Sequence, residues 1–226
     1  LAVVSVLLFH ANPQWCPGGF IGVDIFFVIS GFLITTIIKN DIKHETFSLI
    51  YFYQRRIKRI FPAMFVVIFA SNIAGWFIMF PIDYEELGES TIAACFSLAN
   101  VYFWFKSGYF ATASELKPLL HTWSLSIEEQ FYLFLPLLLL AKFTAKHQLK
   151  IIGSITLVSL IICIYGTKIS PSATFYLLPT RVWELALGSL LSVLILRINQ
   201  TESLISETLR NILGSIGLLL ILTSLL

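Results

Sequence analysis

The stretch GGFIGVDIFFVISGFLI, residues 18–34, decides the fold class of this chain. It is an apolar run with a single ionisable residue, Asp24, near the start of the expected helix. An intramembrane carboxylate costs about 2.5 to 3.5 kcal/mol and so normally has a partner, such as a cation, a backbone N–H group or a helix end. The stretch therefore predicts a transmembrane helix in which Asp24 is partnered and Gly31 lets a neighbouring helix pack closely.

Similar apolar runs recur along the whole chain. Of its 226 residues, 57% are hydrophobic and 12% are charged, which lies outside the usual balance of a soluble domain. The runs come close to the length needed to cross roughly 30 Å of hydrocarbon. We expect an all-α, polytopic transmembrane helix bundle with roughly seven to eight membrane segments and no separate soluble domain. The expected spans are residues 1–9, 20–38, 61–80, 122–141, 150–166, 176–196 and 211–226, with a shorter apolar segment at 90–105.

Charge and cysteine content exclude several classes of function. The net charge of +2 arises from basic clusters beside apolar runs, which suits membrane orientation and gives no reason to expect a nucleic-acid partner. The cysteines, Cys16, Cys95 and Cys163, show no metal-ligand spacing. We therefore predict neither a metal site nor a required disulfide. Leu1 and Leu226 both lie inside apolar runs, so we expect the chain to be part of a longer protein.

Basic connections predict the orientation of the spans. Loops rich in Lys and Arg face the cytoplasm, and the candidates are Lys39 to Arg59, Lys142 to Lys150 and Arg197 to Arg210. If segment 90–105 crossed the membrane, the second of these loops would face outward. If that segment is re-entrant or interfacial, all three loops face the cytoplasm together. We favour the second arrangement.

His10 ends the first apolar run and is followed by Asn12 and Pro13. This position puts an imidazole at the membrane boundary, where it can reach both water and a bound substrate. An unperturbed histidine titrates near neutral pH, which suits a general base. The alternative is an interfacial histidine that only ends a span.

The sequence YFYQRRIKRIFPA, residues 51–63, carries a basic cluster before the next span, with Pro62 expected in that helix's first turn. Positive-inside anchoring alone would explain such a cluster. The functional alternative is that Arg56 and Arg59, three residues apart on one helical face, grip phosphates.

The segment PLLHTWSLSIEEQFYL, residues 118–133, concentrates polar side chains on one helical face. The residues concerned, spaced three and four apart, are His121, Ser124, Glu128 and Tyr132. Adjacent glutamates inside a membrane helix commonly mark a polar cavity or a proton path. The structural alternative is that Glu128 and Glu129 lock helices together through ion pairs.

The sequence LPTRVWELALG, residues 178–188, places Arg181 and Glu184 three residues apart near the start of another span. They either pair with each other or take part in a site.

Several of these motifs together resemble one known family. LLFHA (7–11), GVDIFFVISGFLI (22–34), RRIKRIFPA (55–63), SGYFATASELKPLLHTWSLSIEEQFYL (107–133) and RVWELALG (181–188) are similar, in order and spacing, to membrane acyltransferase family 3. The similarity is greatest to O-acetylases that modify lipopolysaccharide O-antigen or peptidoglycan, which often carry an SGNH-type domain after the membrane part. Each motif alone would be weak, but the combination is specific.

The resemblance implies an enzyme of the bacterial inner membrane that uses an acyl-CoA donor, usually acetyl-CoA, from the cytoplasmic side. The acceptor would be a hydroxyl of a glycan such as O-antigen, peptidoglycan or exopolysaccharide, and no cofactor would be bound permanently. His10 matches the family's essential histidine, Arg56 and Arg59 its RxxR pair, and Glu128 the glutamate of its WSLxxE motif. The family's basic residue eleven positions before the histidine would precede Leu1, so residues 1–226 are expected to be a partial domain.

On this basis we expect His10 to act as general base or transient acyl acceptor, Glu128 to orient or charge it, and both arginines to hold CoA phosphates. The further candidates for the substrate cavity are Asp24, His121, Ser124, Tyr132, Arg181 and Glu184. An alternative from another class is a proton-coupled transporter or flippase in which Asp24 and Glu128 relay protons. A transporter predicts inverted repeats and broken helices, and no such repeat is visible in the sequence.

Overall fold

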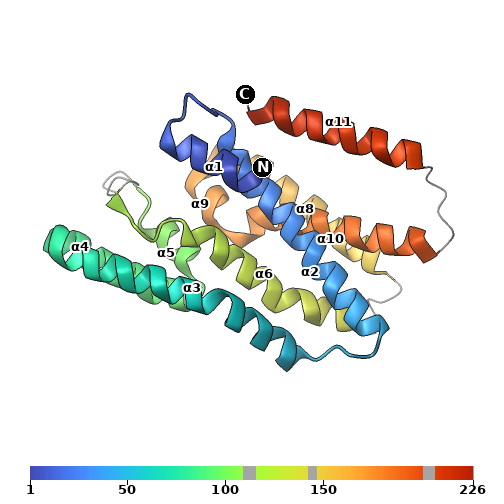
Figure 1. Ribbon diagram of the computed structural model, residues 1–226, viewed down its shortest axis with the longest axis horizontal. Coiled ribbons are helices and arrows are strands. Elements are labelled where there is room, and N and C mark those ends of the chain that lie inside the picture. The colour runs from blue at the N-terminus through green and yellow to red at the C-terminus, as the bar shows by residue number, and fades with distance from the viewer. Residues whose placement is uncertain (109–115, 142–146, 201–206, 226) are drawn as a thin grey trace.

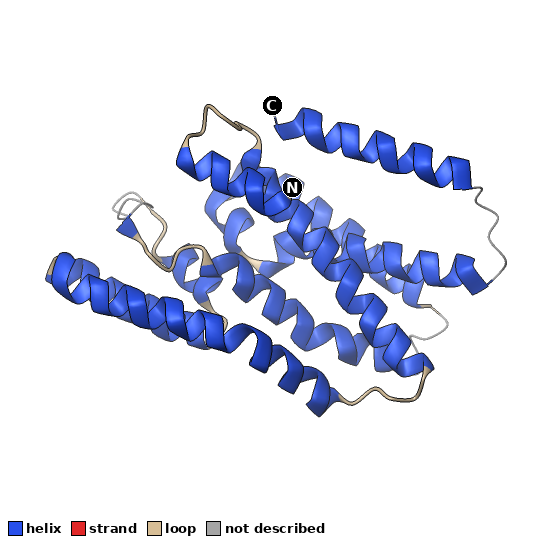
Figure 2. Ribbon diagram, in the orientation of Figure 1, coloured by secondary structure: helices blue, strands red, loops and turns tan. Residues whose placement is uncertain are grey.

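The computed structural model describes residues 1–108, 116–141, 147–200 and 207–225, whose regular structure is entirely helical (Figures 1 and 2). The helices are α1 (Ala2–Ala11), the 3-10 helix η1 (Gly19–Ile21), α2 (Gly22–Lys43), α3 (Leu49–Ile78), α4 (Pro81–Cys95), α5 (Ala99–Phe105), α6 (Thr122–Leu140), α8 (Gln148–Ile169), α9 (Pro171–Tyr176), α10 (Leu178–Gln200) and α11 (Glu207–Leu225). The predicted all-α class is confirmed.

Four segments of the described chain are long and apolar enough to cross a membrane. They are Gly19–Lys43, Leu49–Ile78, Gln148–Ile169 and Pro171–Arg197. α1 and the apolar part of α11 are shorter. The chain is therefore a multi-helix membrane protein, whereas the predicted count of seven to eight membrane segments stays a prediction.

The most extensive contact between helices of the described chain joins α2 and α10, which run in the same direction (Figure 1). A Cβ atom at Gly31 would collide with the backbone carbonyl of Leu185, and one at Gly188 would collide with that of Val28. Small residues drive helix association in lipid because they let backbones approach. The prediction that Gly31 serves helix packing is confirmed.

Hydroxyl groups continue this contact along the helices. Thr35 donates to Ser189 Oγ, and the hydroxyls of Thr36 and Ser192 are hydrogen-bonded, each at 2.8 Å. The two pairs are 154 and 156 residues apart in sequence, a nearly constant interval that parallel helices in fixed register produce. The α2–α10 pair is thus a rigid unit.

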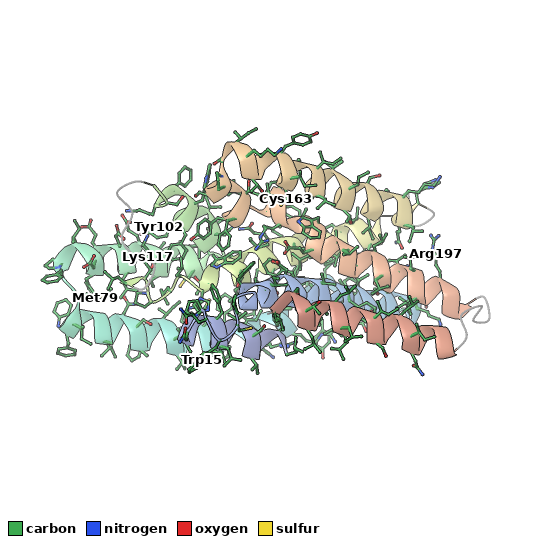
Figure 3. All side chains as sticks on the ribbon, turned by 90° about the horizontal axis from the view of Figure 1, so that it is seen from above. Trp15, Met79, Tyr102, Lys117, Cys163 and Arg197 are labelled. Carbon is green, nitrogen blue, oxygen red and sulfur yellow. The ribbon has the colours of Figure 1, made fainter. Side chains whose placement is uncertain are left out.

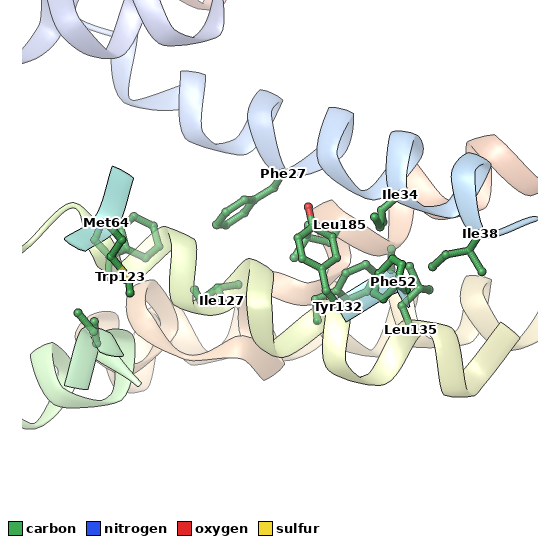
Figure 4. Packing of buried hydrophobic residues seen from close by; sticks show 14 of the residues in the cluster. Phe27, Ile34, Ile38, Phe52, Met64, Trp123, Ile127, Tyr132, Leu135 and Leu185 are labelled. Carbon is green, nitrogen blue, oxygen red and sulfur yellow. The ribbon is translucent and has the colours of Figure 1, made fainter. Parts of the chain in front are cut away.

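α6 packs against this pair and completes the core. Figure 4 shows Phe27 pointing from α2 toward α6, and Tyr132 pointing from α6 toward α2. Phe27, Ile127 and Leu185 are completely buried. Three helices far apart in sequence therefore share one interior.

The basic cluster lies inside α3 and not before it. α3 begins at Leu49, where Ser48 Oγ accepts a hydrogen bond from the backbone N–H of Tyr51, so Pro62 is an interior residue and the expected first-turn position is wrong. The helix starts early because its first turns pack on the bundle. Phe52 is buried, and the hydroxyl of Tyr53 donates to the carbonyl of Leu133 in α6 at 3.0 Å.

Segment 90–105 does not form one helix. It comprises the end of α4, a bend in which Ser97 has a φ of 56°, and α5. α6 fixes this bend, since Gln130 donates to the carbonyl of Ser97 at 2.9 Å and Ser126 Oγ accepts from the N–H of Ala99 at 3.2 Å. The predicted span 176–196 corresponds to α10, which begins at Leu178 after α9 has ended at Tyr176.

The helix ends that flank the basic connections gather at one end of the bundle. Lys39 of α2 donates to Gln148 of α8 at 2.8 Å, and Gln148 donates to the carbonyl of Leu139 in α6 at 3.2 Å. Met79, just after α3, lies at the opposite end of the molecule from Arg197 of α10 (Figure 3). This arrangement agrees with a segment 90–105 that turns back. Residues 142–146 of the second basic connection lie outside the described residues.

We therefore expect Lys43 and Lys150 to face the same side of the membrane, the cytoplasm, because positively charged connections are retained there. Single cysteines introduced at these positions, in a background without native cysteines, can be probed with an impermeant thiol reagent in intact cells. Neither should label from outside, while a cysteine replacing Glu85 of α4 should. External labelling at position 150 alone would contradict the arrangement.

Candidate functional site

A cavity of about 320 Å³ opens between α2, α3 and α6. Its polar lining residues are Ser30, Arg56, Arg59, Ser124, Glu128 and Tyr132. Apolar side chains of α2, together with Ile60 and Leu125, form the remaining wall. The cavity thus places positive and negative side chains in one apolar pocket, as binding sites for charged small molecules require.

Arg56 is held in place on two sides. Its Nε and Nη2 both donate to Oε1 of Glu129, at 3.3 and 2.9 Å. Its guanidinium also lies over the ring of Tyr132, 3.7 Å from the ring centroid. The cationic group is therefore positioned by one ion pair and one cation–π contact from α6.

Arg59 lies one helical turn further along α3 and lines the same cavity. In contrast to Arg56, it is exposed, and the described part of the chain offers it no hydrogen bond or ion pair. Arg55 points elsewhere, since it pairs with Asp41 at 2.9 Å. Within the cluster, Arg59 is thus the arginine without an acidic partner among the described residues.

Glu128 is buried at the wall of the cavity, with 4% of its surface exposed. Its Oε2 accepts a hydrogen bond from the hydroxyl of Tyr132 at 3.4 Å, and that hydroxyl is also hydrogen-bonded to Ser30. No partner for its Oε1 is found among the described residues. A buried carboxylate oxygen without a partner is costly, so this atom is suited to accept a hydrogen bond from a ligand.

A second cavity of about 340 Å³ adjoins the first along the seam between α3 and α6, and Arg59 lines both. Its walls are mostly apolar, and His121 stands at its rim. Of the predicted polar face of α6, Ser124, Glu128 and Tyr132 therefore share one cavity and His121 borders the next.

His10 lies apart from these cavities, in the last turn of α1. Its Nδ1 is 2.8 Å from the carbonyl oxygen of Val6, which can only accept, so Nδ1 carries the proton. In the neutral imidazole Nε2 then keeps its lone pair and can act as a base. The side chain is exposed, and no hydrogen bond between His10 and Glu128 is found in the described structure. The structure thus brings Glu128 to the cavity and not to His10.

Asp24, Arg181 and Glu184 form a separate cluster between α2 and α10, in which Glu184 is buried and Asp24 is half-buried. The Nη1 of Arg181 lies 3.2 Å from Asp24 Oδ1 and 2.7 Å from Glu184 Oε1. The guanidinium also lies near the rings of Trp123 and Phe175, at 5.6 and 5.5 Å. The partner that the sequence requires for Asp24 is therefore Arg181, and of the two alternatives for Arg181 and Glu184 the structure shows the pairing.

Two residues at or beside the cavity, Glu129 and Ser30, are not among the site residues that the sequence predicts. Glu129 does not line the cavity but binds Arg56 of α3, so the alternative that the glutamates lock helices through ion pairs holds for Glu129. Ser30 lies in an apolar motif and reaches the cavity because Gly31, on the adjacent face of α2, packs against α10. The only sequence signal for Glu129 was an acidic pair that could balance the basic cluster of residues 55–59.

Fold and site together define a membrane protein whose helices enclose a cavity with an available arginine and a buried, partly unsatisfied carboxylate. Residues 1–226 match the acyltransferase domain family over their whole length, and the chain belongs to that family. The chain is thus an acyltransferase domain. No solved structure matches it.

Relatives with named activities are O-acetyltransferases. The chain is 36% identical over 229 residues to the peptidoglycan O-acetyltransferase OatA of Listeria monocytogenes, covering 97% of this chain and 37% of that protein. It is 37% identical over 208 residues to the putative peptidoglycan O-acetyltransferase YrhL of Bacillus subtilis, covering 85% of this chain and 31% of the relative. An uncharacterized protein of Haemophilus influenzae is 36% identical over 211 residues, covering 89% of this chain and 85% of that protein. The chain therefore spans about a third of the named enzymes' length.

We expect Arg181→Met to destabilise the protein strongly, because it leaves the buried carboxyl group of Glu184 and the half-buried one of Asp24 without their cation. Removing one partner of a buried ion pair lowers the free energy of unfolding by about 3 to 5 kcal/mol. Thermal unfolding of the full-length protein in detergent measures the loss. Adding Asp24→Asn and Glu184→Gln to the Arg181→Met variant should recover part of it, since the unpaired charges are then removed. An unchanged unfolding temperature for Arg181→Met alone would contradict a stabilising role for the cluster.

Proposed function

We propose that this protein is a multi-pass O-acyltransferase of the bacterial inner membrane, which transfers an acetyl group from acetyl-CoA to a hydroxyl of a cell-envelope glycan. The observation that carries the proposal is the match of the whole chain to the acyltransferase domain family, with relatives named as O-acetyltransferases. Among envelope glycans, peptidoglycan is the first acceptor to test, because two of these relatives are named for it. O-antigen and exopolysaccharide present the same hydroxyl chemistry.

The cavity between α2, α3 and α6 is the proposed donor site. Coenzyme A carries phosphates, and planar guanidinium groups recognise phosphate through paired, charge-assisted hydrogen bonds. Arg59 offers a guanidinium that has no partner among the described residues. Arg56 lies one helical turn away in a fixed orientation. Both arginines lie in the part of α3 near the basic connections, the end at which a cytoplasmic donor would arrive.

His10 is the proposed base for the acceptor. During transfer the acyl carbon loses its bond to the CoA sulfur and gains one to the hydroxyl oxygen, and the hydroxyl proton must be accepted. Nε2 of His10 can take that proton while the Nδ1–H bond to Val6 fixes the ring. Since His10 does not contact the cavity carboxylate, we assign Glu128 to the donor side, where its free Oε1 can accept an N–H or O–H group of the donor.

The expected SGNH-type domain would belong to a longer protein of which residues 1–226 are the membrane part, a view supported by the greater length of the named relatives. A proton-coupled transporter, the alternative from sequence, is not favoured, because the family is one of acyltransferases.

Replacing His10 by Ala in the full-length protein should nearly abolish glycan acetylation while membrane insertion stays intact, because an exposed imidazole contributes little to packing. Loss of base catalysis lowers the rate by roughly 100-fold to 10,000-fold. Mass spectrometry of the isolated glycan measures the acetate, with expression and membrane localisation checked in parallel. Normal acetate on the glycan would remove His10 from the mechanism.

Arg56→Lys combined with Arg59→Lys should preserve topology, which needs only positive charge, but weaken acetyl-CoA binding. We expect a loss of about 1 to 3 kcal/mol, or roughly 5-fold to 150-fold in affinity, because lysine cannot form the paired guanidinium–phosphate contact. Titration calorimetry on protein in nanodiscs measures the affinity. Arg55→Lys is the matched control, since Arg55 belongs to the same cluster but pairs with Asp41. Equal affinities for all three proteins would place the donor elsewhere.

A further inference from the structure

We propose that Glu129 is a positioning residue for the donor phosphates: it binds one edge of the Arg56 guanidinium and leaves the other edge open to the ligand. This inference rests on the proposed donor site, which it deepens. Glu129 is not part of the polar face formed by Ser124, Glu128 and Tyr132, and its contribution is indirect, through Arg56.

The hydrogen bonds to Glu129 occupy only part of the arginine. A guanidinium has five N–H groups arranged around a rigid plane. The N–H group of Nε and one N–H group of Nη2 both donate to the same carboxylate oxygen, Oε1 of Glu129. In the described structure the remaining N–H groups of Arg56 have no hydrogen-bond partner, although the side chain is only 14% exposed. Because Arg56 lines the cavity, these N–H groups are available to a ligand that accepts hydrogen bonds.

Tyr132 fixes the plane that Glu129 alone would leave free to rotate. Its ring lies 3.7 Å beneath the Arg56 guanidinium carbon, so the cation is stacked on an aromatic face. The hydroxyl of Tyr132 is hydrogen-bonded to Ser30 of α2 and to Glu128 of α6. The ring sets the tilt of the guanidinium, and the carboxylate sets its direction.

The two neighbouring arginines show what this arrangement adds. Arg55 makes a single Nη2 bond to Asp41, with 43% of its side chain exposed. Arg59 has no partner among the described residues and is free to change rotamer. Ordering a long side chain on binding costs conformational entropy, and a side chain that is already fixed avoids that cost. Arg56 therefore provides the preorganised contact and Arg59 the adaptable one.

Substitutions at Glu129 distinguish a positioning role for this residue from competition with the ligand for Arg56. If Glu129 competed with phosphate for Arg56, its removal would tighten anion binding. If it positions Arg56, its removal weakens binding, and glutamine restores it, because a single oxygen accepts both N–H groups and the amide carbonyl of glutamine can do the same. The charge of Glu129 is then less important than the oxygen it presents.

The test measures the affinity of the full-length protein in nanodiscs for coenzyme A. We expect Glu129→Ala to weaken binding roughly tenfold, and Glu129→Gln to remain within about threefold of the unmodified protein. In an Arg56→Lys background, Glu129→Ala should cause little further loss, because lysine has no planar edge to orient. A general structural defect would not depend on the residue at position 56.

Glu89→Ala is the matched control, since it removes an ion pair of comparable length, 2.7 Å to Lys106, on a helix that does not line the cavity. Unchanged or tighter binding by Glu129→Ala, or an equal loss in the Gln and Ala variants, would overturn the proposal. If the Ala variant does not fold, Glu129→Asp replaces it, because the shorter side chain cannot reach both N–H groups. If Arg59→Lys and Arg56→Lys also leave the affinity unchanged, the assignment of the cavity as the donor site is wrong. If these variants weaken binding while Glu129→Ala does not, only the role proposed for Glu129 is wrong.

Discussion

The contact between α2 and α10 is the constraint on which the rest of the structure depends. In lipid, apolar side chains gain little free energy when contacts with lipid are replaced by contacts with each other. Helices therefore associate through close backbone packing and buried polar contacts. α2 and α10 use both. Their backbones approach closely at Gly31 and Gly188, and the Asp24–Arg181 ion pair joins them at one end. This contact fixes the rotation of α2 and thereby directs Ser30 to the side where α6 and the cavity lie.

α6 divides its polar residues between two tasks. Ser126 and Gln130 bind the backbone around the α4–α5 bend, which lets the chain turn back without leaving its polar groups unsatisfied. Glu128 and Tyr132 face the cavity instead. One helix therefore supports the irregular part of the fold and supplies the cavity wall, so a change in its rotation would affect both.

Charges inside the bundle are mostly paired with nearby partners, and two charged groups that keep an unpartnered atom line the candidate donor site. Arg56 is paired with Glu129, and Arg181 with Asp24 and Glu184. Within the described structure, Arg59 and one oxygen of Glu128 remain without a partner beside the same cavity. A site that leaves one cationic group and one acceptor atom available can bind a ligand that carries both phosphate and hydrogen-bond donors.

The sequence by itself determined the helical class, the approximate position of the four candidate spans, and the polar face of α6, because apolar run length and helical spacing are local properties. It also indicated that Asp24 needs a partner, but that this partner is Arg181 of α10 follows only from the α2–α10 register. The early start of α3, the bend at Ser97 and the pairing of Arg56 with Glu129 rather than Glu128 were likewise decided by tertiary structure. Each depends on which side chains of α6 meet a helix distant in sequence, and residue spacing within one helix carries no information about that meeting.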